Sequence, residues 1–345
     1  MRILLTADPL IPVPPVGYGG IERIVDALVQ EYRVRGHEVA LLAKSGSTCA
    51  AGRRLFWPCN RVDGGANVLR NGLALAAAVR RFQPDVVHSF ARLAFLLPLF
   101  LLRRRLPKIM SYQRHTGPRQ IRWANRLGGR ALSFTGCSEF ICAMGRPGGG
   151  TWTAIPNFVD LAKIDFIPEV PPDAPLVFLS RVESIKGPDL AIAIARRSGR
   201  RLILAGNRAH QGTESTFFDT RIAPHLGRDG IEWIGEVGDA QKNRLLGGAA
   251  ALLVPIQWDE PFGIVFAEAL AAGTPVITCA RGATPEIVSP GKTGWFIDSL
   301  DTGVAAVKRI SELDRRACRL DCEAHFSLAR CADRYLELYA AAGRR

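Results

Sequence analysis

The sequence predicts an α/β protein of two domains, each built around a parallel sheet that is covered by helices on both faces. Short apolar runs with strand character alternate with stretches of helical periodicity along the chain, which is typical of parallel sheets. At 345 residues the chain is long for one hydrophobic core and suits two. A proline-rich segment, residues 167–175, separates the two sets of alternating runs and is interpreted as the linker between domains.

The first half contains one clearly defined helix and five predicted strands. Apolar side chains from Ile21 to Tyr32 recur at the spacing of one helical face, and Gly36 marks the end of this helix. The chain starts directly with a strand and shows no signal-peptide pattern, so we expect a cytoplasmic protein. The predicted strands are Ile3–Ala7, Val39–Ala43, Asp85–Ser89, Lys108–Tyr112 and Leu132–Gly136.

The second half repeats the alternation with six predicted strands, each followed by a helix-like stretch. A last helical segment runs from about Ser327 to Ala341. We therefore predict domains at residues 1–157 and 158–320, followed by a C-terminal helix within residues 321–345. The predicted strands are Leu176–Ser180, Leu202–Ala205, Ile231–Ile234, Ala251–Val254, Val276–Cys279 and Trp295–Ile297.

Composition restricts the class of protein. The eight cysteines form no Cys-x-x-Cys and no cluster with metal-ligand spacing, which favours reduced thiols in the core. The formal net charge is +13, yet the arginines are scattered and no basic strand is interleaved with aromatic residues, so we expect no nucleic acid partner. An anionic membrane, a diphosphate ligand and a generally arginine-rich composition all remain possible explanations of the charge.

One apolar run is followed by a cluster of basic residues. The ten residues Leu93–Leu102 are too few to span a bilayer, and Arg103, Arg104, Arg105 and Lys108 come directly after them. Two interpretations remain open: a helix that covers the sheet and has a basic end, or an amphipathic patch that docks on anionic lipid.

Two glutamates flank a predicted helix start in the second half. Phe262-Gly263 ends a loop and residues 264–272 have helical composition, so Glu260 lies just before the helix and Glu268 about two turns inside it. Unpaired N–H groups and the helix dipole favour a phosphate at this N-terminus, and carboxylates accept hydrogen bonds from sugar hydroxyls. The pattern predicts a site for a sugar nucleotide, with one glutamate on the sugar and the other on the ribose.

Two cations follow the first strand of the second half. Arg181 and Lys186 lie after Leu176–Ser180 and before a helix that starts at Gly187. Because open parallel sheets bind ligands at the carboxyl ends of their strands, the two cations can converge on a diphosphate. A pair of solvated loop cations is the alternative.

The motifs resemble those of glycosyltransferase family 4, retaining enzymes of the GT-B fold. The resemblance rests on two adjoining motifs: Glu260-Pro-Phe-Gly, with Glu268 eight residues after Glu260, and Ala269-x-x-x-Gly-x-Pro-Val-Ile. It extends along the chain from Tyr18-Gly-Gly-Ile-Glu22 to Gly282-Ala-Thr-Pro-Glu286. It implies two Rossmann-like domains facing across a cleft, with the C-terminal helix crossing back to the first domain. The middle of the first half matches poorly.

The resemblance also implies roles for individual residues. Arg181 and Lys186 would stabilise the diphosphate leaving group, Glu260 would contact the sugar, and His115 would lie beside the reacting carbon of the donor. His88 is a candidate for the acceptor side because of its own position at the end of another strand, and not because of the resemblance. The full prediction is catalytic His115, Glu260, Arg181 and Lys186, with donor contacts from Gly19, Gly20, Arg181, Lys186, Val237, Glu260, Phe262, Gly263, Ile264 and Glu268.

The site motifs and the resemblance together predict a glycosyltransferase that moves a sugar from a nucleoside diphosphate, with UDP preferred over GDP, to an acceptor hydroxyl. The resemblance implies that configuration at the anomeric carbon is retained. No Asp-x-Asp motif occurs, so we expect no metal and no cofactor. Lipid-linked sugar and lipopolysaccharide are among the possible acceptors, and the enzyme is expected in the cytoplasm, with possible peripheral contact at the inner face of the membrane. A sugar-nucleotide epimerase and a non-catalytic basic nucleotide- or nucleic-acid-binding protein are the alternatives.

Overall fold

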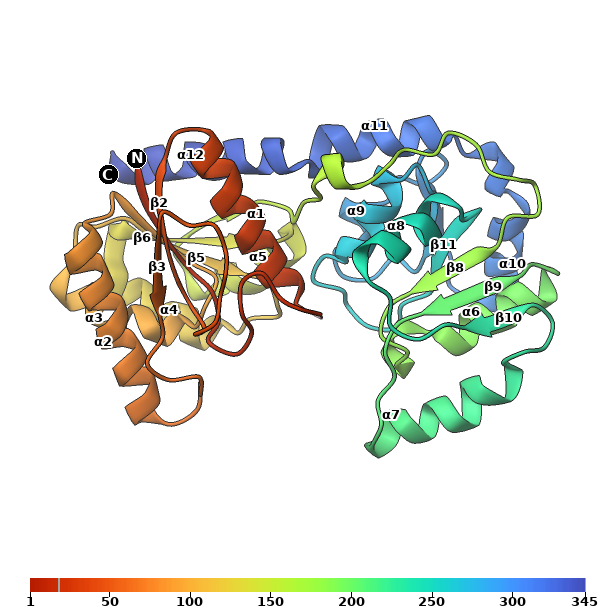
Figure 1. The fold of residues 1–345 in the computed structure, drawn as a ribbon, viewed down its shortest axis with the longest axis horizontal. Helices are drawn as coiled ribbons and strands as arrows, with labels where there is room; N and C mark the ends of the chain where they lie inside the picture. Colours follow the sequence, from red (N-terminus) through yellow and green to blue (C-terminus); the bar gives the residue numbers. More distant parts are fainter. Residues whose placement is uncertain (18, 345) are drawn as a thin grey trace. The chain divides into compact units, whose positions relative to one another are not determined.

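The computed structural model describes residues 1–17 and 19–344, which form two compact units, each built on its own parallel sheet (Figure 1). Unit 1 contains residues 1–158 and the chain from Leu328 onward, and unit 2 contains Val159–Ser327. The prediction of two Rossmann-like α/β domains is confirmed, and the C-terminal helix belongs to the same unit as the first half of the chain.

Unit 1 has a seven-stranded sheet in the order β3-β2-β1-β4-β5-β6-β7, with all neighbours parallel. The five predicted strands are present within a residue of their predicted bounds. The outer strands β3 and β7 were not predicted, because their partly exposed sequences, Arg-Arg-Leu-Phe and Thr-Trp-Thr-Ala, lack the apolar run of a strand buried on both faces. The strands are β1 (Arg2–Thr6), β2 (Glu38–Ala43), β3 (Arg53–Phe56), β4 (Val86–Ser89), β5 (Lys108–Tyr112), β6 (Leu132–Gly136) and β7 (Thr151–Ala154).

Helices cover this sheet, and the last of them comes from the C-terminus. The hydroxyls of Tyr32 in α1 and Tyr339 in α12 lie 3.1 Å apart in the buried contact between these two helices. The α-helices of unit 1 are α1 (Gly20–Val34), α2 (Gly65–Phe82), α3 (Leu97–Leu102), α4 (Pro118–Gly128), α5 (Glu139–Gly145) and α12 (Leu328–Gly343). Short 3₁₀ helices occur at Leu93–Leu96, Gly129–Ala131 and Arg146–Gly148.

The apolar run Leu93–Leu102 forms a 3₁₀ turn followed by α3, and it has two different sides. Phe95, Leu96, Leu99 and Phe100 are buried in the core, as expected for a segment that covers the sheet. Leu97, Leu101 and Leu102 are exposed.

Lys108, the last of the basic residues after this run, is not exposed with the arginines. Its side chain is fully buried, and its Nζ donates to the carbonyls of Arg103 and Leu106, each at 2.7 Å. Burial lowers the pKa of this lysine to about 8. Lys108 therefore does not meet lipid headgroups, as the lipid-docking interpretation would require. It fixes the turn that contains the neighbouring arginines.

Unit 2 has a six-stranded parallel sheet in the order β10-β9-β8-β11-β12-β13. All six predicted strands are present. They are β8 (Leu176–Leu179), β9 (Leu202–Ala205), β10 (Ile231–Trp233), β11 (Ala251–Val254), β12 (Val276–Thr278) and β13 (Gly294–Phe296). The α-helices are α6 (Pro188–Arg197), α7 (Gly212–Phe217), α8 (Asp239–Gly247), α9 (Ile264–Ala271), α10 (Leu300–Lys308) and α11 (Arg315–Phe326), and Phe218–Ile222 forms a π-helical turn. Short 3₁₀ helices lie at Leu161–Lys163, Ser184–Lys186, Ala223–His225, Thr284–Glu286 and Ile310–Glu312.

The proline-rich segment 167–175 is not a free linker. The Ile167 N–H donates to the carbonyl of Ala272 at 3.1 Å, and the buried guanidinium of Arg315 donates to the carbonyl of Ile167 at 2.7 Å. The segment is therefore fixed to unit 2. The chain passes between the units at Phe158/Val159 and again at Ser327/Leu328, and Val159 and Ser327 form a parallel bridge.

All eight cysteines are free, and seven of them are buried, as the sequence predicted for core thiols. Among the described residues, no helix combines the length and the apolar character needed to cross a bilayer.

Candidate functional site

The predicted donor residues of unit 2 come together where the loops after β8 and β11 meet. The Gln257 N–H donates to the carbonyl of Ile185 at 2.8 Å, which joins the two loops. Between them, Gly187 has φ +70°, and a Cβ there would lie 2.2 Å from the carbonyl oxygen of Pro255. Only glycine allows this approach, which brings Lys186 next to the loop that contains Glu260.

Lys186 and Glu260 form a partly buried ion pair at this point. The Nζ of Lys186 lies 2.5 Å from Oε2 of Glu260, and the side chains are 10% and 13% exposed. The indole N–H of Trp258 donates to the same oxygen at 2.7 Å, and the ammonium lies 4.8 Å from the centroid of the indole ring. Both donors use the same carboxylate oxygen, Oε2. The sequence predicted the roles of Lys186 and Glu260 separately, but it predicted neither their contact nor that of Trp258.

Helix α9 begins directly after this cluster. Gly263 precedes it with φ +88°, and no side chain among the described residues caps the N-terminus, so the first-turn amides of Ile264 and its neighbour can accept an anion. Phe262 is buried and packs on Phe326 with ring centroids 5.8 Å apart. This contact anchors the loop in the core.

Glu268 lies closer to the start of α9 than predicted. Because α9 starts at Ile264, Glu268 is its fifth residue, a little over one turn inside rather than two. Its Oε1 lies 2.5 Å from the Nζ of Lys242, in the neighbouring helix α8.

Lys242 is a residue of the site that sequence reasoning missed. It also pairs with Asp239 at 3.2 Å. Burial opposes the charge of Lys242, but the carboxylates of Glu268 and Asp239 more than offset this and raise its pKa. A single lysine in a polar helix gives no signal in the sequence, so only the fold could reveal this contact.

Arg181 and Val237 lie at other positions of the same sheet edge. Arg181 follows β8, and its guanidinium pairs with Glu183 at 2.5 Å. Val237 is partly buried in the loop between β10 and α8, after Gly235. In this structure Arg181 is thus held by a carboxylate of its own loop, and an incoming diphosphate would compete with Glu183 for it.

In unit 1, the predicted glycines lie at the start of α1, where Gly19 is the N-cap and Gly20 the first residue. Tyr18, the first residue of the predicted motif, lies outside the described residues. Glu22 is buried behind these glycines, and its pKa is raised by burial and by Asp8, although its own backbone N–H and Arg114 oppose this. Asp8 itself pairs with Arg92 at 2.9 Å. The edge of unit 1 at the carboxyl ends of β1, β4 and β5 is therefore charged.

His115 lies in the loop between β5 and α4 and is exposed. Its ring contacts Phe140 edge-on, with centroids 5.8 Å apart. Two residues earlier, both amide atoms of Gln113 are shielded from solvent and have no hydrogen-bond partner within the described chain. Because buried polar groups are normally paired, Gln113 is a further candidate for ligand contact. It was not singled out from the sequence.

His88 does not suit the acceptor role suggested from its position at a strand end. The side chain is fully buried, its Nδ1 lies 2.5 Å from the hydroxyl of Tyr339, and its Nε2 lies 2.6 Å from that of Ser111. Burial lowers its pKa to about 3. His88 is thus a neutral core residue that joins α12 to the sheet, and the suggestion of acceptor contact is wrong.

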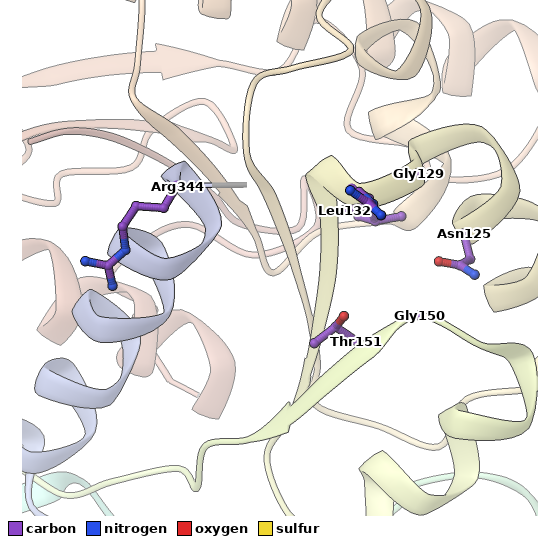
Figure 2. Close-up of a pocket in the computed structure, with 7 residues that line it drawn as sticks. Asn125, Gly129, Leu132, Gly150, Thr151 and Arg344 are labelled. Carbon is purple, nitrogen blue, oxygen red and sulfur yellow. The ribbon is translucent and has the colours of Figure 1, made fainter.

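A wide hollow of about 770 Å³ lies elsewhere in unit 1 (Figure 2). It is lined by Asn125 and Arg130 near the end of α4, by Leu132 and Thr151 at the starts of β6 and β7, and by Arg344. These are the amino ends of the strands, the edge opposite to the one at which open α/β sheets bind their substrates. None of the predicted site residues lines it.

The chain matches two family models that together cover most of its length. The "Glycosyltransferase Family 4" model matches residues 18–163, and the "Glycosyl transferases group 1" model matches residues 163–320. The passage from one model to the other lies near the boundary between unit 1 and unit 2.

Relatives of this chain include a glycogen synthase and an inositol phosphate glycosyltransferase. A glycogen synthase of Mycobacterium tuberculosis is 28% identical, with 100% of this chain and 95% of the relative covered. A D-inositol 3-phosphate glycosyltransferase of Mycolicibacterium smegmatis is 31% identical over 54% of this chain and 44% of the relative.

Solved structures share the fold over nearly the whole chain. AviGT4, a glycosyltransferase involved in avilamycin A biosynthesis, has a TM-score of 0.76 and 28% identity, with 99% of this chain and 98% of that chain covered. HepE of Anabaena, solved in complex with UDP and glucose, has a TM-score of 0.73 over 99% of this chain and 100% of its own. At 17% identity, HepE is evidence for the fold alone.

Proposed function

Because the chain belongs to the family 4 glycosyltransferases of the GT-B fold, we propose that it transfers a sugar from a UDP-sugar to an acceptor hydroxyl, without a metal ion and with retention at the anomeric carbon. That it is a glycosyltransferase follows from its family. The nucleotide, the metal independence and the stereochemistry are the parts we propose.

The observation that supports the proposal best is the Lys186–Glu260 pair at the N-terminus of α9. The uncapped amides at the start of α9 would favour a phosphate, and Lys186, which pairs with Glu260 just before the helix, would supply a positive charge. Arg181 follows β8 at the same edge of the sheet and would bring a second charge. Together these two cations would neutralise the diphosphate as it leaves, the task that a divalent ion performs in metal-dependent transferases.

The two glutamates would bind opposite ends of the donor, the sugar and the ribose. Oε1 of Glu260 would accept from a hydroxyl of the sugar, and Glu268, held by Lys242, would accept from the ribose. A donor diphosphate would take Lys186 from Glu260, so binding exchanges one anionic partner of the lysine for another. This exchange limits the cost of removing the ammonium from its partner.

The proposed reaction proceeds on one face of the sugar. The bond between the anomeric carbon and the diphosphate oxygen breaks, and the acceptor oxygen bonds to that carbon from the same side. The departing phosphate oxygen takes the acceptor proton. In this scheme the protein needs no nucleophile, and Lys186 and Arg181 act by stabilising the negative charge that grows on the diphosphate.

The experiment that tests the proposal needs no known acceptor. The purified protein is incubated with UDP- and GDP-sugars in EDTA, and slow release of nucleoside diphosphate is followed. We expect release from a UDP-sugar above that from the GDP-sugars. Release from GDP-sugars alone would overturn the choice of nucleotide, and strict dependence on Mg²⁺ or Mn²⁺ would overturn the metal-free mechanism.

A further inference from the structure

Three neighbouring helices of unit 1 expose large apolar side chains to solvent. We call this surface the α2–α3–α4 face. The apolar residues occur as pairs four positions apart, one pair on each helix, with Leu102 in addition. They are Leu69 and Leu73 on α2, Leu97, Leu101 and Leu102 on α3, and Trp123 and Leu127 on α4, with exposures from 43% for Leu97 to 66% for Leu101 and Trp123.

The three helices form one continuous layer. Helix α3 contacts both α2 and α4 (Figure 1). A Cβ added at Gly72 of α2 would lie 3.0 Å from Pro98, and one at Gly128 of α4 would lie 3.1 Å from the ring of Phe100. Because residues four apart lie on one side of a helix, each exposed pair forms a stripe on the side that the core leaves uncovered.

The segments that form this surface are strongly basic, and the three helices themselves contain no carboxylate. Residues 86–138 include nine arginines and one lysine, but no Asp and no Glu, and α2 also contains three arginines and no acid. Lys108 is buried, so the exposed charge comes from arginines. Those exposed on the three helices and the turns after them are Arg70, Arg80, Arg81, Arg103, Arg104, Arg105, Arg119, Arg122, Arg126 and Arg130.

We propose that the α2–α3–α4 face docks on an anionic lipid surface. Exposed leucine and tryptophan side chains would enter the boundary between headgroups and acyl chains, and the arginines beside them would meet the phosphates. The positive charge of this face favours an anionic membrane over a second copy of this chain as the partner, because a second copy packed on the same face would place the same arginines against one another. The proposal does not depend on the donor or the reaction proposed above.

The test is sedimentation with vesicles of phosphatidylcholine, with and without phosphatidylglycerol, at low and high salt. We expect the full chain to pellet with the anionic vesicles at low salt and to be released by salt. The variant R103Q/R104Q/R105Q should bind about a hundredfold more weakly, since each cation near the surface adds about fivefold. The variant L101Q/L102Q should also bind more weakly, although its charge is unchanged.

Matched control variants lie in unit 2. The variant R228Q/K308Q/R316Q removes three exposed cations, and L320Q changes a leucine that is 56% exposed. Both should bind vesicles like the wild type, and circular dichroism should show that every variant is folded.

Three results would overturn the proposal. The first is absence of binding to anionic vesicles, and the second is equal loss of binding in the unit 2 controls. The third is a combination of two observations: vesicle binding is weakened in R103Q/R104Q/R105Q but unchanged in L101Q/L102Q, and the wild type binds heparin as tightly as it binds anionic vesicles. This combination would indicate a general site for polyanions.

Discussion

Replacing Glu268 should weaken nucleotide binding more than it slows the reaction. In the proposed site, one oxygen of Glu268 is held by Lys242 at 2.5 Å and the other accepts from the ribose. A hydrogen bond to a charged group contributes about 1.5–3 kcal/mol, so Glu268→Ala should raise the Kd for UDP by about 10- to 150-fold. The side chain is only 16% exposed, which favours the upper part of this range because water screens the lost interaction less.

Isothermal titration with UDP measures this effect without an acceptor. Glu260→Ala provides the contrast: it removes a proposed sugar contact but frees Lys186 for the diphosphate, so turnover should fall while UDP affinity is kept. Glu323→Ala, which removes a more exposed carboxylate of α11 in the same unit, is the control and should bind UDP like the wild type. If Glu268→Ala binds UDP as tightly as the wild type, the ribose assignment is refuted.

Two further predictions concern the leaving group and the core. Lys186→Ala should lower turnover about a hundredfold, which is the usual effect of removing one group that stabilises the transition state, and the wild type should remain active in excess EDTA. A loss of turnover below threefold in Lys186→Ala, or inactivation of the wild type by EDTA, would argue against the cationic mechanism. His88 has a pKa of about 3 in the folded protein against about 6.5 unfolded, so below about pH 6.5 the unfolded chain binds a proton that the folded chain does not. The free energy of unfolding, measured by urea titration, should therefore fall by about 2 kcal/mol when the pH is lowered from about 7 to about 5. His88→Gln should remove this part of the pH dependence. An unchanged pH dependence in His88→Gln would show that another group is responsible.

Much of the fold could be predicted because its central strands are buried on both faces and read as apolar runs. The outer strands β3 and β7 could not, since strands at the edge of a sheet can be polar. The segment 167–175 looked like a linker because it is rich in proline. Its attachment to unit 2 depends on Arg315, about 150 residues further along the chain.

The candidate site, too, could be predicted only in part from the sequence. The local motifs indicated Lys186, Glu260 and Glu268, because helix starts and strand ends have patterns that can be read within a few residues. The partners Trp258 and Lys242 are brought to them by packing, and Lys242 comes from a different helix. His88 was misjudged because its position at a strand end is visible in the sequence, whereas its burial beneath Tyr339 of the last helix is not.

The central claim is retaining, metal-free transfer from a UDP-sugar, and the configuration of the first sugar released tests it most directly. The wild type and Lys186→Ala are incubated with an α-configured UDP-sugar in EDTA, and proton NMR records the released sugar before its anomers equilibrate. We predict that the α-anomer appears first with the wild type and that Lys186→Ala releases it much more slowly. First appearance of the β-anomer, or no release of sugar from any UDP-sugar, would contradict the account.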